Sequence, residues 1–233
     1  MKHIGIVVSA GKGLRVGGDT PKQYMDLCGR PVITYCLAAM QESFIDEIVI
    51  VVGAGDVEFV SKEIVEKYSF TKVKAVVEGG AERSDSVFNG LKAVSAQDSY
   101  VYIQDAARPM LNGAILKAAR EDVEAFGSSV IAVRAKDTVK VVNDDGFVVT
   151  TPDRRYLWNV QTPQAFSFSD IYEAYLRYLD KGSDAVTDDA SVMEQFGDLP
   201  VHITEGIYEN IKITTPEDFI TAERFLKGNR FNL

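Results

Sequence analysis

The chain has 233 residues, of which 46% are hydrophobic and 25% are charged. This composition is ordinary for a folded globular protein and too apolar for a disordered one. Its length fits one large α/β domain, because a single hydrophobic core can grow to this size before a chain divides. The net charge of −9 disfavours nucleic-acid binding, which requires a basic surface to displace counterions from the phosphates.

The cysteines and the N-terminus suggest a protein of the cytoplasm. Cys28 and Cys36 are eight positions apart and match neither a Cys-x-x-Cys zinc pattern nor a disulfide framework. We expect both to be buried apolar side chains. The first apolar run, residues 4–8, is too short for a secretory signal, and no stretch approaches the ~20 apolar residues of a membrane span. We therefore predict cytoplasmic residence without membrane contact.

The first half of the chain alternates between two hydrophobic patterns. Short β-branched runs predict buried parallel strands at residues 4–8, 48–52, 73–77, 100–104 and 130–133. Helical periodicity separates them, over residues 31–40, 56–68, 83–94 and 112–126. Pro31 suits the first turn of the first helix. This order predicts a three-layer, doubly wound α/β fold with a mostly parallel sheet and right-handed crossovers.

The alternation breaks after residue 133. Two β-rich runs, 138–142 and 147–151, flank a turn sequence at 143–146 and predict an inserted β-hairpin, which a partner subunit is one candidate to cover. The remaining elements that we expect are an extended segment at 158–162, helices at 169–181, 188–196 and 216–226, and a strand at 211–214. We find no linker or repeat, and so predict one domain over residues 1–233 with an arm at about 136–160.

A glycine-rich loop, Ser9-Ala10-Gly11-Lys12-Gly13-Leu14-Arg15, follows the first predicted strand. Doubly wound proteins bind ligands at this edge of the sheet, and glycines let backbone N–H groups approach phosphate oxygens. The loop lacks the Gly-Lys-Ser/Thr of a P-loop. It also misses the dinucleotide fingerprint by one place, because Val16 stands where the third glycine belongs.

Two cations distinguish this loop from a dinucleotide site. Arg15 and Lys22 are close enough in sequence to face the same phosphates. Attack on a triphosphate develops charge that added cations stabilise. The pattern therefore favours nucleotidyl transfer, and its alternative is a flexible turn with a solvated basic patch.

Three further segments carry candidate chemistry. Asp105-Ala106-Ala107-Arg108-Pro109 follows a predicted strand, where the aspartate either holds Mg²⁺ beside small residues or pairs with Arg108 to cap a turn. The segment 79–86 leads a helix whose N-terminus suits a base, ribose or phosphate. The acidic residues Asp184, Asp188 and Asp189 fit either a metal site or a solvated helix start capped by Thr187.

Together these segments resemble the 2-C-methyl-D-erythritol 4-phosphate cytidylyltransferases of the non-mevalonate isoprenoid pathway, over nearly the whole chain. Several motifs in a fixed order are far more specific than one. The matching pieces are residues 10–15, Pro21-Lys22-Gln23-Tyr24, Gly79-Gly80 with Arg83 and Ser86, 105–109, Asp153-Arg154, Gln161-Thr162-Pro163-Gln164, Thr187-Asp188-Asp189-Ala190-Ser191 and Asn210-Ile211-Lys212. Two positions depart from the pattern without removing a charge: Ser9, where an alanine is common, and Gln104, where a histidine often precedes the aspartate.

The resemblance implies transfer of CMP from CTP to methylerythritol phosphate, with Mg²⁺, on a Rossmann-like nucleotidyltransferase fold. Its implied catalytic residues are Arg15 and Lys22, which stabilise the transition state at the α-phosphate, and Arg154 and Lys212, which orient the second substrate's phosphate. Nucleotide contacts are implied for Ala10, Gly11, Gly13, Gly80, Ser86, Asp105 and Ala106, and Asp105 also lies near the metal. Polyol-phosphate contacts are implied for Thr138, Arg154, Thr162, Thr187 and Lys212.

The resemblance also implies a homodimer in which the arm crosses to the neighbouring subunit, so that Thr138 and Arg154 serve the partner's site. The nearest alternative is a ribitol 5-phosphate or other sugar-alcohol phosphate cytidylyltransferase, but Tyr24 and Leu157-Trp158 look more like the methylerythritol enzymes. A nicotinamide-dependent dehydrogenase would need an acidic residue near the end of the second strand, which Val51-Val52-Gly53-Ala54 lacks. A non-catalytic nucleotide-binding regulator would bind CTP yet release no pyrophosphate.

Overall fold

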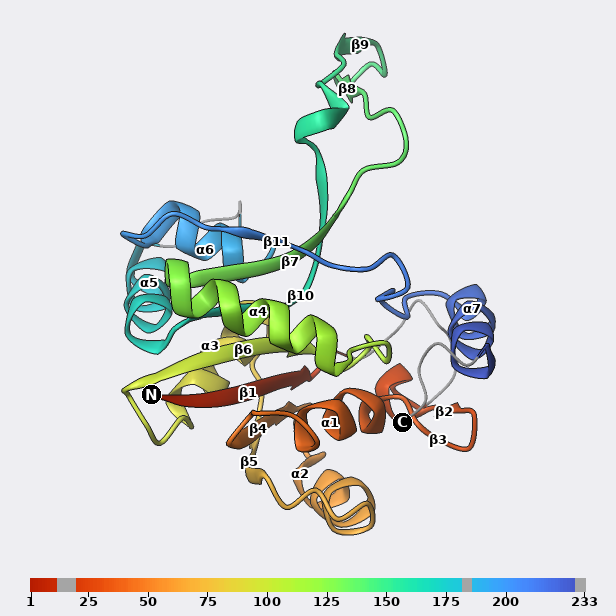
Figure 1. The fold of residues 1–233 in the computed structure, drawn as a ribbon, viewed down its shortest axis with the longest axis vertical. Coiled ribbons are helices and arrows are strands. Elements are labelled where there is room, and N and C mark those ends of the chain that lie inside the picture. The colour runs from red at the N-terminus through yellow and green to blue at the C-terminus, as the bar shows by residue number, and fades with distance from the viewer. Residues whose placement is uncertain (12–19, 182–185, 229–233) are drawn as a thin grey trace.

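A computed structural model describes residues 1–11, 20–181 and 186–228 of the chain (Figure 1). Its centre is a seven-stranded sheet with the order β11-β7-β10-β6-β1-β4-β5. The strands are β1 (Lys2–Ser9), β4 (Glu47–Val52), β5 (Val73–Glu78), β6 (Ser99–Asp105), β7 (Ser128–Arg134), β10 (Trp158–Ser167) and β11 (Ile203–Glu205). β10 runs antiparallel to both of its neighbours, and the other described pairings in this sheet are parallel. The five predicted strands and the mostly parallel α/β fold are confirmed.

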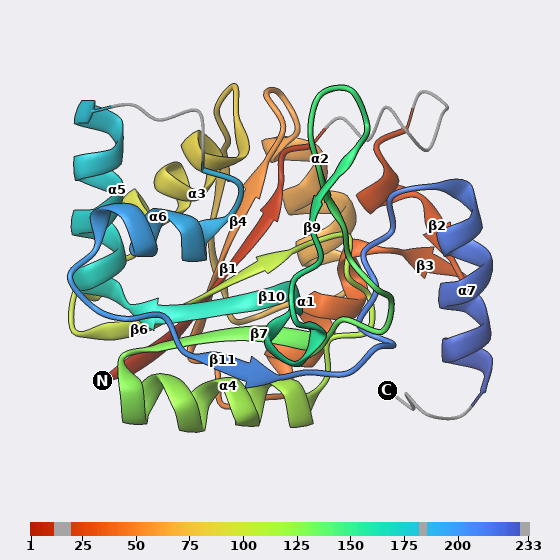
Figure 2. The same ribbon diagram turned by 90° about the horizontal axis from the view of Figure 1, so that it is seen from above.

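Helices cover both faces of the sheet and form two hydrophobic cores (Figure 2). The helices are α1 (Ile33–Gln41), α3 (Arg83–Lys92), α4 (Gly113–Phe126), α5 (Phe168–Lys181) and α6 (Asp189–Phe196). α1 and α4 pack on one face, while α3, α5 and α6 pack on the other. Within β1 the alternation is visible, since Ile4 and Ile6 join one core and Val7 joins the other. Burial on both faces explains why the central strands are nearly continuous apolar runs.

The structure corrects the predicted start of the first helix. α1 begins at Ile33, and Pro31 instead lies in β3 (Arg30–Pro31), which pairs with β2 (Asp26–Leu27) in a small hairpin. Cys28 takes a left-handed backbone conformation, φ 53°, in the turn of this hairpin. It is exposed, so the prediction of a buried Cys28 is wrong, whereas Cys36 is buried as predicted.

Two other elements differ in kind from the sequence prediction. The helix expected at 56–68 forms as α2 (Val57–Phe59) followed by a π-helical segment, η2 (Val60–Glu66). The strand expected at 211–214 is absent from this described segment, because Ile213 fills a small core beneath α7 (Pro216–Lys227) instead of pairing in the sheet. The edge strand beside β7 is instead β11, which pairs with β7 in parallel. Pro216 begins α7 as predicted.

The predicted hairpin is confirmed, with shorter strands. The chain leaves the sheet after β7, forms β8 (Val141–Val142), β9 (Val148–Thr150) and the 3₁₀ turn η3 (Arg154–Tyr156), and returns along β10. This segment projects far from the sheet and its helices (Figure 1). Its apolar side chains are exposed, among them Val142, Phe147, Val148, Val149 and Tyr156. We call this projecting segment the arm; its predicted bounds of 136–160 and the one-domain division stay predictions.

Among the residues that the structure describes, none of the helices combines the length and apolar character needed to cross a lipid bilayer.

Candidate active site

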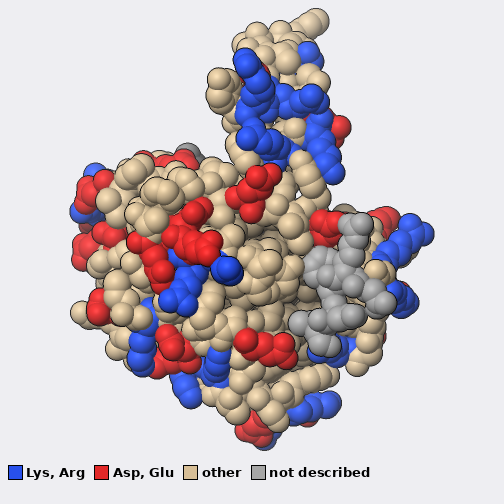
Figure 3. Space-filling model, viewed as in Figure 1, with Lys and Arg blue, Asp and Glu red and all other residues tan. Residues whose placement is uncertain are grey.

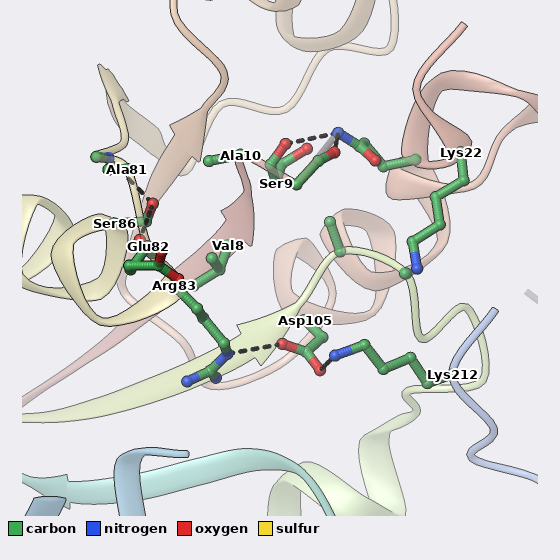
Figure 4. A pocket seen from close by; sticks show the side chains of 15 residues that line it. Val8, Ser9, Ala10, Lys22, Ala81, Glu82, Arg83, Ser86, Asp105 and Lys212 are labelled. Carbon is green, nitrogen blue, oxygen red and sulfur yellow. Dashed lines mark hydrogen bonds and ion pairs between the residues drawn. The ribbon is translucent and has the colours of Figure 1, made fainter. Parts of the chain in front are cut away.

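A cavity of about 470 Å³ opens at the carboxyl ends of β1 and β6, beside the first turn of α3 (Figure 4). Parallel strands in a doubly wound sheet present ligand sites at this edge. The cavity is lined from five separate parts of the chain: Val8, Ser9, Ala10 and Gly11; Lys22 and Gln23; Gly80, Ala81, Glu82, Arg83 and Ser86; Asp105, Ala106 and Ala107; and Lys212. The fold therefore gathers motifs that the sequence separates by up to two hundred residues.

Most of the predicted site residues that the structure describes line this cavity. They are Ala10, Gly11, Lys22, Gly80, Ser86, Asp105, Ala106 and Lys212. Gly13 and Arg15 lie outside the described residues. The remaining predicted substrate contacts lie elsewhere. Thr162 is buried behind the site, where its hydroxyl accepts a hydrogen bond from the N–H of Asp105 at 3.0 Å. Thr187 lines a neighbouring cavity with Arg83 and Tyr175.

Asp105 is the electrostatic centre of the cavity. The ammonium of Lys212 lies 2.7 Å from Oδ2, and the guanidinium groups of Arg83 and Arg108 lie 3.5 Å and 3.7 Å from the carboxylate. Burial raises the pKa of Asp105, but these three cations outweigh burial and hold the pKa well below its usual range. Asp105 is therefore charged at neutral pH, and the predicted pairing with Arg108 is one of three ion pairs.

Arg83 is held from behind by a residue whose role the sequence did not indicate. Asp189 is fully buried and accepts two hydrogen bonds from the Arg83 guanidinium, at 3.1 Å and 2.7 Å. The hydroxyl of Tyr175 donates a third, at 2.6 Å. Burial lowers the pKa of Arg83, but the Asp189 and Asp105 carboxylates outweigh it and raise the pKa. A bidentate contact of this kind fixes the guanidinium plane.

The helix start predicted at Asp188 and Asp189 forms, but its cap is not Thr187. Asp188 is the N-cap of α6, and its side chain accepts the N–H of Ser191 at 2.9 Å. Asp189 points into the core, where Arg83 neutralises it. The pairing joins residues 106 positions apart, which explains why local sequence could not reveal it. Asp184 lies outside the described residues.

Close packing shapes the side of the cavity formed by β1 and α3. A Cβ added at Gly79 would lie 2.5 Å from the Ser86 hydroxyl and 2.6 Å from the Ala10 Cβ. The N–H of Gly80 donates to the Ser86 hydroxyl at 3.1 Å, and a Cβ at Gly80 would collide with Asp85. These glycines allow the start of α3 to approach the end of β1. The resulting wall includes the small residues Ala10, Gly80 and Ser86, which suits a flat base or a ribose.

Lys22 extends into the cavity from a 3₁₀ turn, η1 (Lys22–Tyr24) (Figure 4). Its ammonium donates to the backbone carbonyl of Ile213 at 2.6 Å. The N–H of Ile213 in turn donates to the carbonyl of Ala107 at 2.8 Å. The segment after Asn210 thus ties Lys22 and Lys212 to the end of β6, so that two ammonium groups and Arg83 surround the cavity.

The two other predicted polar contacts, Thr138 and Arg154, lie on the arm. Arg154 donates to the carbonyl of Lys136 at 2.7 Å. The guanidinium of Arg134 lies 4.5 Å from the centre of the Trp158 ring and donates to the carbonyl of Arg155 at 3.1 Å. Lys and Arg side chains gather on this part of the surface (Figure 3). The arm thus carries its own basic cluster, separate from the cavity beside β1.

The donor set allows one mode of magnesium binding. In the described part of the chain, no three His, Cys, Asp or Glu residues gather as a ready metal cage. Mg²⁺ is commonly held by one or two carboxylates with water and substrate phosphates completing the shell. Asp105 lines the cavity in its ionised form, which fits this mode, although Lys212 already contacts Oδ2.

The doubly wound sheet, the glycine-bearing end of β1 and the cation-lined cavity define an α/β protein of the nucleotidyltransferase fold. A family model described as 2-C-methyl-D-erythritol 4-phosphate cytidylyltransferase matches residues 3–228. The chain belongs to this family, which confirms the resemblance and makes the chain a cytidylyltransferase. The dehydrogenase alternative is excluded by this assignment.

Individual relatives agree with the family assignment. Proteins named 2-C-methyl-D-erythritol 4-phosphate cytidylyltransferase from Alkaliphilus oremlandii and Lachnospira eligens are 49% and 46% identical to the chain. The alignments cover 97% and 96% of this chain, and 95% and 98% of the relatives. The solved 4-diphosphocytidyl-2C-methyl-D-erythritol synthase of Anaerococcus prevotii superposes with a TM-score of 0.86 at 36% identity, over 97% of this chain and 96% of that one.

Proposed function

We propose that this chain transfers CMP from CTP to 2-C-methyl-D-erythritol 4-phosphate, releasing pyrophosphate, as a step in making isoprenoid precursors. The observation that carries the proposal is the convergence of Lys22, Arg83, Asp105 and Lys212 on one cavity at the end of β1. The reaction brings a phosphate monoester and a triphosphate together, so its main requirements are positioning and charge neutralisation. Membership of the family supports the same substrates.

The proposed mechanism needs no covalent enzyme intermediate. An oxygen of the methylerythritol phosphate attacks the α-phosphorus of CTP, and a new P–O bond forms. The bond from the α-phosphorus to the bridging oxygen of the β-phosphate breaks, and pyrophosphate leaves with that electron pair. Lys22, with Arg15 from the glycine loop, stabilises the negative charge that develops on the α-phosphate oxygens.

The cytidine end of CTP is assigned to the wall of the cavity formed by β1 and α3. Ala10, Gly11, Gly13, Gly80, Ser86 and Ala106 are its proposed contacts. The tight packing of Gly79 and Gly80 against Ser86 and Asp85 supports this assignment, because it leaves a slot between small residues. Backbone groups along such a slot recognise a base by its edge without a bulky side chain.

The second substrate is assigned to the opposite side. Lys212 is the proposed contact for the methylerythritol phosphate, together with Thr138 and Arg154 from the arm of a partner subunit and with Thr162 and Thr187. Arg154 and the exposed apolar side chains of the arm support a homodimer in which each arm lies over the neighbouring cavity. Thr162 and Thr187 have weaker support, because one is buried behind Asp105 and the other faces a neighbouring cavity.

Asp105 is the proposed ligand for Mg²⁺ on the bound triphosphate. The metal, when bound, would neutralise phosphate charge and so assist the departure of pyrophosphate. Arg83, Lys212 and Arg108 keep Asp105 in the ionised form that a metal ligand requires. We further propose that the enzyme works in the cytoplasm, where CTP is available.

A substrate matrix tests the proposal. Purified protein is incubated with CTP, UTP or ATP against methylerythritol phosphate, ribitol 5-phosphate or a sugar phosphate, and both pyrophosphate and the nucleotide product are measured. We expect rapid turnover with CTP and methylerythritol phosphate alone. Faster turnover with ribitol 5-phosphate would replace the proposed substrate, and CTP binding without any product would identify a non-catalytic regulator.

A further inference from the structure

Gln23 occupies a position that the proposed mechanism leaves unexplained. It follows Lys22 directly in η1, and its side chain is buried, with 3% of its surface exposed. Its amide nitrogen donates to the carbonyl of Ser9 at 2.7 Å and to the carbonyl of Gly11 at 3.0 Å. One side chain thus joins the turn that carries Lys22 to the point where the chain leaves β1.

These two carbonyls lie where the regular hydrogen bonding of β1 ends. Ser9 is buried, so its carbonyl needs a hydrogen-bond donor inside the protein, whereas Gly11 is exposed. Because one amide group serves two carbonyls, small changes in the position of Gln23 disturb both bonds. The distance between η1 and the glycine-bearing end of β1 is therefore tightly restricted.

Three further contacts hold the turn from its other sides. The hydroxyl of Tyr24 donates to Asp56 at 3.3 Å, and its ring packs edge-on against Phe59, with ring centres 5.3 Å apart. The ammonium of Lys22 donates to the carbonyl of Ile213 at 2.6 Å. The Gln23 side chain adds two direct hydrogen bonds from this turn to the backbone at the start of the glycine loop.

We propose that Gln23 is a positioning residue, which holds the backbone of Lys22 at a fixed distance from the end of β1 and thereby places the Lys22 ammonium at the α-phosphate. This inference rests on the proposed role of Lys22 in catalysis. Misplacement of a catalytic group by about 1 Å can cost 100-fold in rate. Loss of the Gln23 bonds should therefore lower kcat more than it weakens nucleotide binding.

A double-mutant cycle between Gln23→Met and Lys22→Ala tests the inference. Methionine keeps the approximate length and volume of glutamine but removes the two donated hydrogen bonds. We expect Gln23→Met alone to lower kcat by about 10–100-fold, with less than a roughly threefold change in KM for CTP. In the Lys22→Ala background the same change should lower kcat by less than about threefold, because the group that Gln23 positions is already absent.

The matched control is Gln41→Met. Gln41 also uses its side-chain amide in two hydrogen bonds, to Thr71 and from the N–H of Lys72, but lies outside the cavity lining. The Gln41→Met enzyme should retain the wild-type kcat. Thermal unfolding of all variants shows whether a lower kcat comes from a loss of folded protein. Gln23→Asn, which keeps the amide on a shorter chain, is the second variant and should show the same loss of kcat.

The possible outcomes separate this inference from the proposed function. A normal kcat in Gln23→Met would overturn the positioning role while leaving the proposed function intact. So would an equal fold-loss of kcat from Gln23→Met in the wild-type and Lys22→Ala enzymes. Failure of both Gln23 variants to fold would also overturn it, because Gln23 would then serve the fold alone. If Lys22→Ala itself turned over normally, the proposed catalytic role of Lys22 would fail first.

Discussion

Asp105 shows how a single residue organises the cavity. Its carboxylate lies among Arg83, Arg108 and Lys212, so that one negative charge separates three positive ones. Without substrate, the cations would repel one another if this carboxylate were neutral. Because the charged carboxylate holds the cations together, an anionic substrate meets cations that are already in place. This is the arrangement expected of a preorganised electrostatic site.

The lowered pKa of Asp105 gives a prediction about pH and stability. Because the folded-state pKa lies below the unfolded value of about 3.9, the charged form stabilises the fold above that value and its contribution is lost as the pH falls below it. Asp105→Asn should reduce the free energy of unfolding by about 3 kcal/mol at pH 7, as expected for removing one partner from a buried ion pair. The difference from wild type should narrow as the pH falls below about 4.

Urea unfolding at a series of pH values measures this difference. Asp137→Asn, on the exposed arm, is the control and should unfold like wild type at each pH. A constant difference for Asp105→Asn down to pH 2 would mean that the ion pairs do not stabilise the fold.

Lys22 makes a different prediction, because its proposed task is confined to the transition state. Lys22→Ala should lower kcat by about 10²–10³-fold, the loss typical of removing one transition-state stabiliser. KM for CTP should change much less. Steady-state kinetics with CTP and methylerythritol phosphate measure both constants, and Lys62→Ala on the exposed face of η2 serves as the control. A large rise in KM at unchanged kcat would instead assign Lys22 to ground-state binding.

At the scale of elements, α3 sets the width of the nucleotide slot through its close approach to the sheet. Gly90 faces β1 and β4, and a Cβ there would lie 2.7 Å from Ile6 Cγ2 and 2.8 Å from Val51 Cγ2. Both neighbours are fully buried and cannot move aside freely. The glycine therefore brings α3, with Arg83 and Ser86 in its first turn, near the end of β1.

Gly90→Ala consequently sets two effects against each other. Alanine in a helix interior is favoured over glycine by about 1 kcal/mol, whereas overpacking a dense core costs about 1–3 kcal/mol. The short distances to Ile6 and Val51 indicate that overpacking wins, so we expect a net loss of about 1–2 kcal/mol in the free energy of unfolding. Gly113→Ala, where a Cβ meets nothing within 4 Å, should be within about 0.5 kcal/mol of wild type.

Denaturant unfolding of the two glycine variants measures these differences. A more stable Gly90→Ala would show that α3 can move away from the sheet at little cost, and that its close approach does not set the shape of the cavity.

Elements with a strong local sequence signal have the structure that the sequence predicts. The five apolar strands and the amphipathic helices were predictable because burial on both faces of a parallel sheet imposes those patterns. β11 was not, since three residues, Ile203–Glu205, form too short a run to indicate a strand. Residues 211–214 were wrongly predicted as a strand because their apolar character has another cause. Ile213 is apolar because it fills the small core beneath α7.

In the site, too, residues in local motifs were predictable from the sequence and long-range contacts were not. Lys22, Gly80, Asp105 and Lys212 were predictable because each belongs to a recognisable motif, and all four line the cavity. The supporting contacts were not, because they depend on long-range geometry. Asp189 reaches Arg83 across 106 positions, and no local pattern distinguishes a buried aspartate from a solvated one at a helix start.

At the scale of the whole molecule, the basic groups proposed to bind substrate lie in two places. Lys22 and Lys212 line the cavity beside β1, whereas Arg154 lies on the arm that projects from the sheet. Exposed apolar residues on the same arm, including Phe147 and Val149, are unusual for a monomer surface and suit burial against another copy. We therefore expect the active site to be completed across a homodimer.

Mixing two inactive variants tests this composite site most directly. Lys22→Ala and Arg154→Ala subunits are combined, heterodimers are demonstrated, and formation of the cytidylyl product from CTP and methylerythritol phosphate is measured. If each site takes Lys22 from one subunit and Arg154 from the other, a heterodimer holds one intact site, and random mixing of equal amounts should restore about a quarter of wild-type activity. Activity no greater than that of the two separate variants, with heterodimers present, would contradict a site shared between subunits.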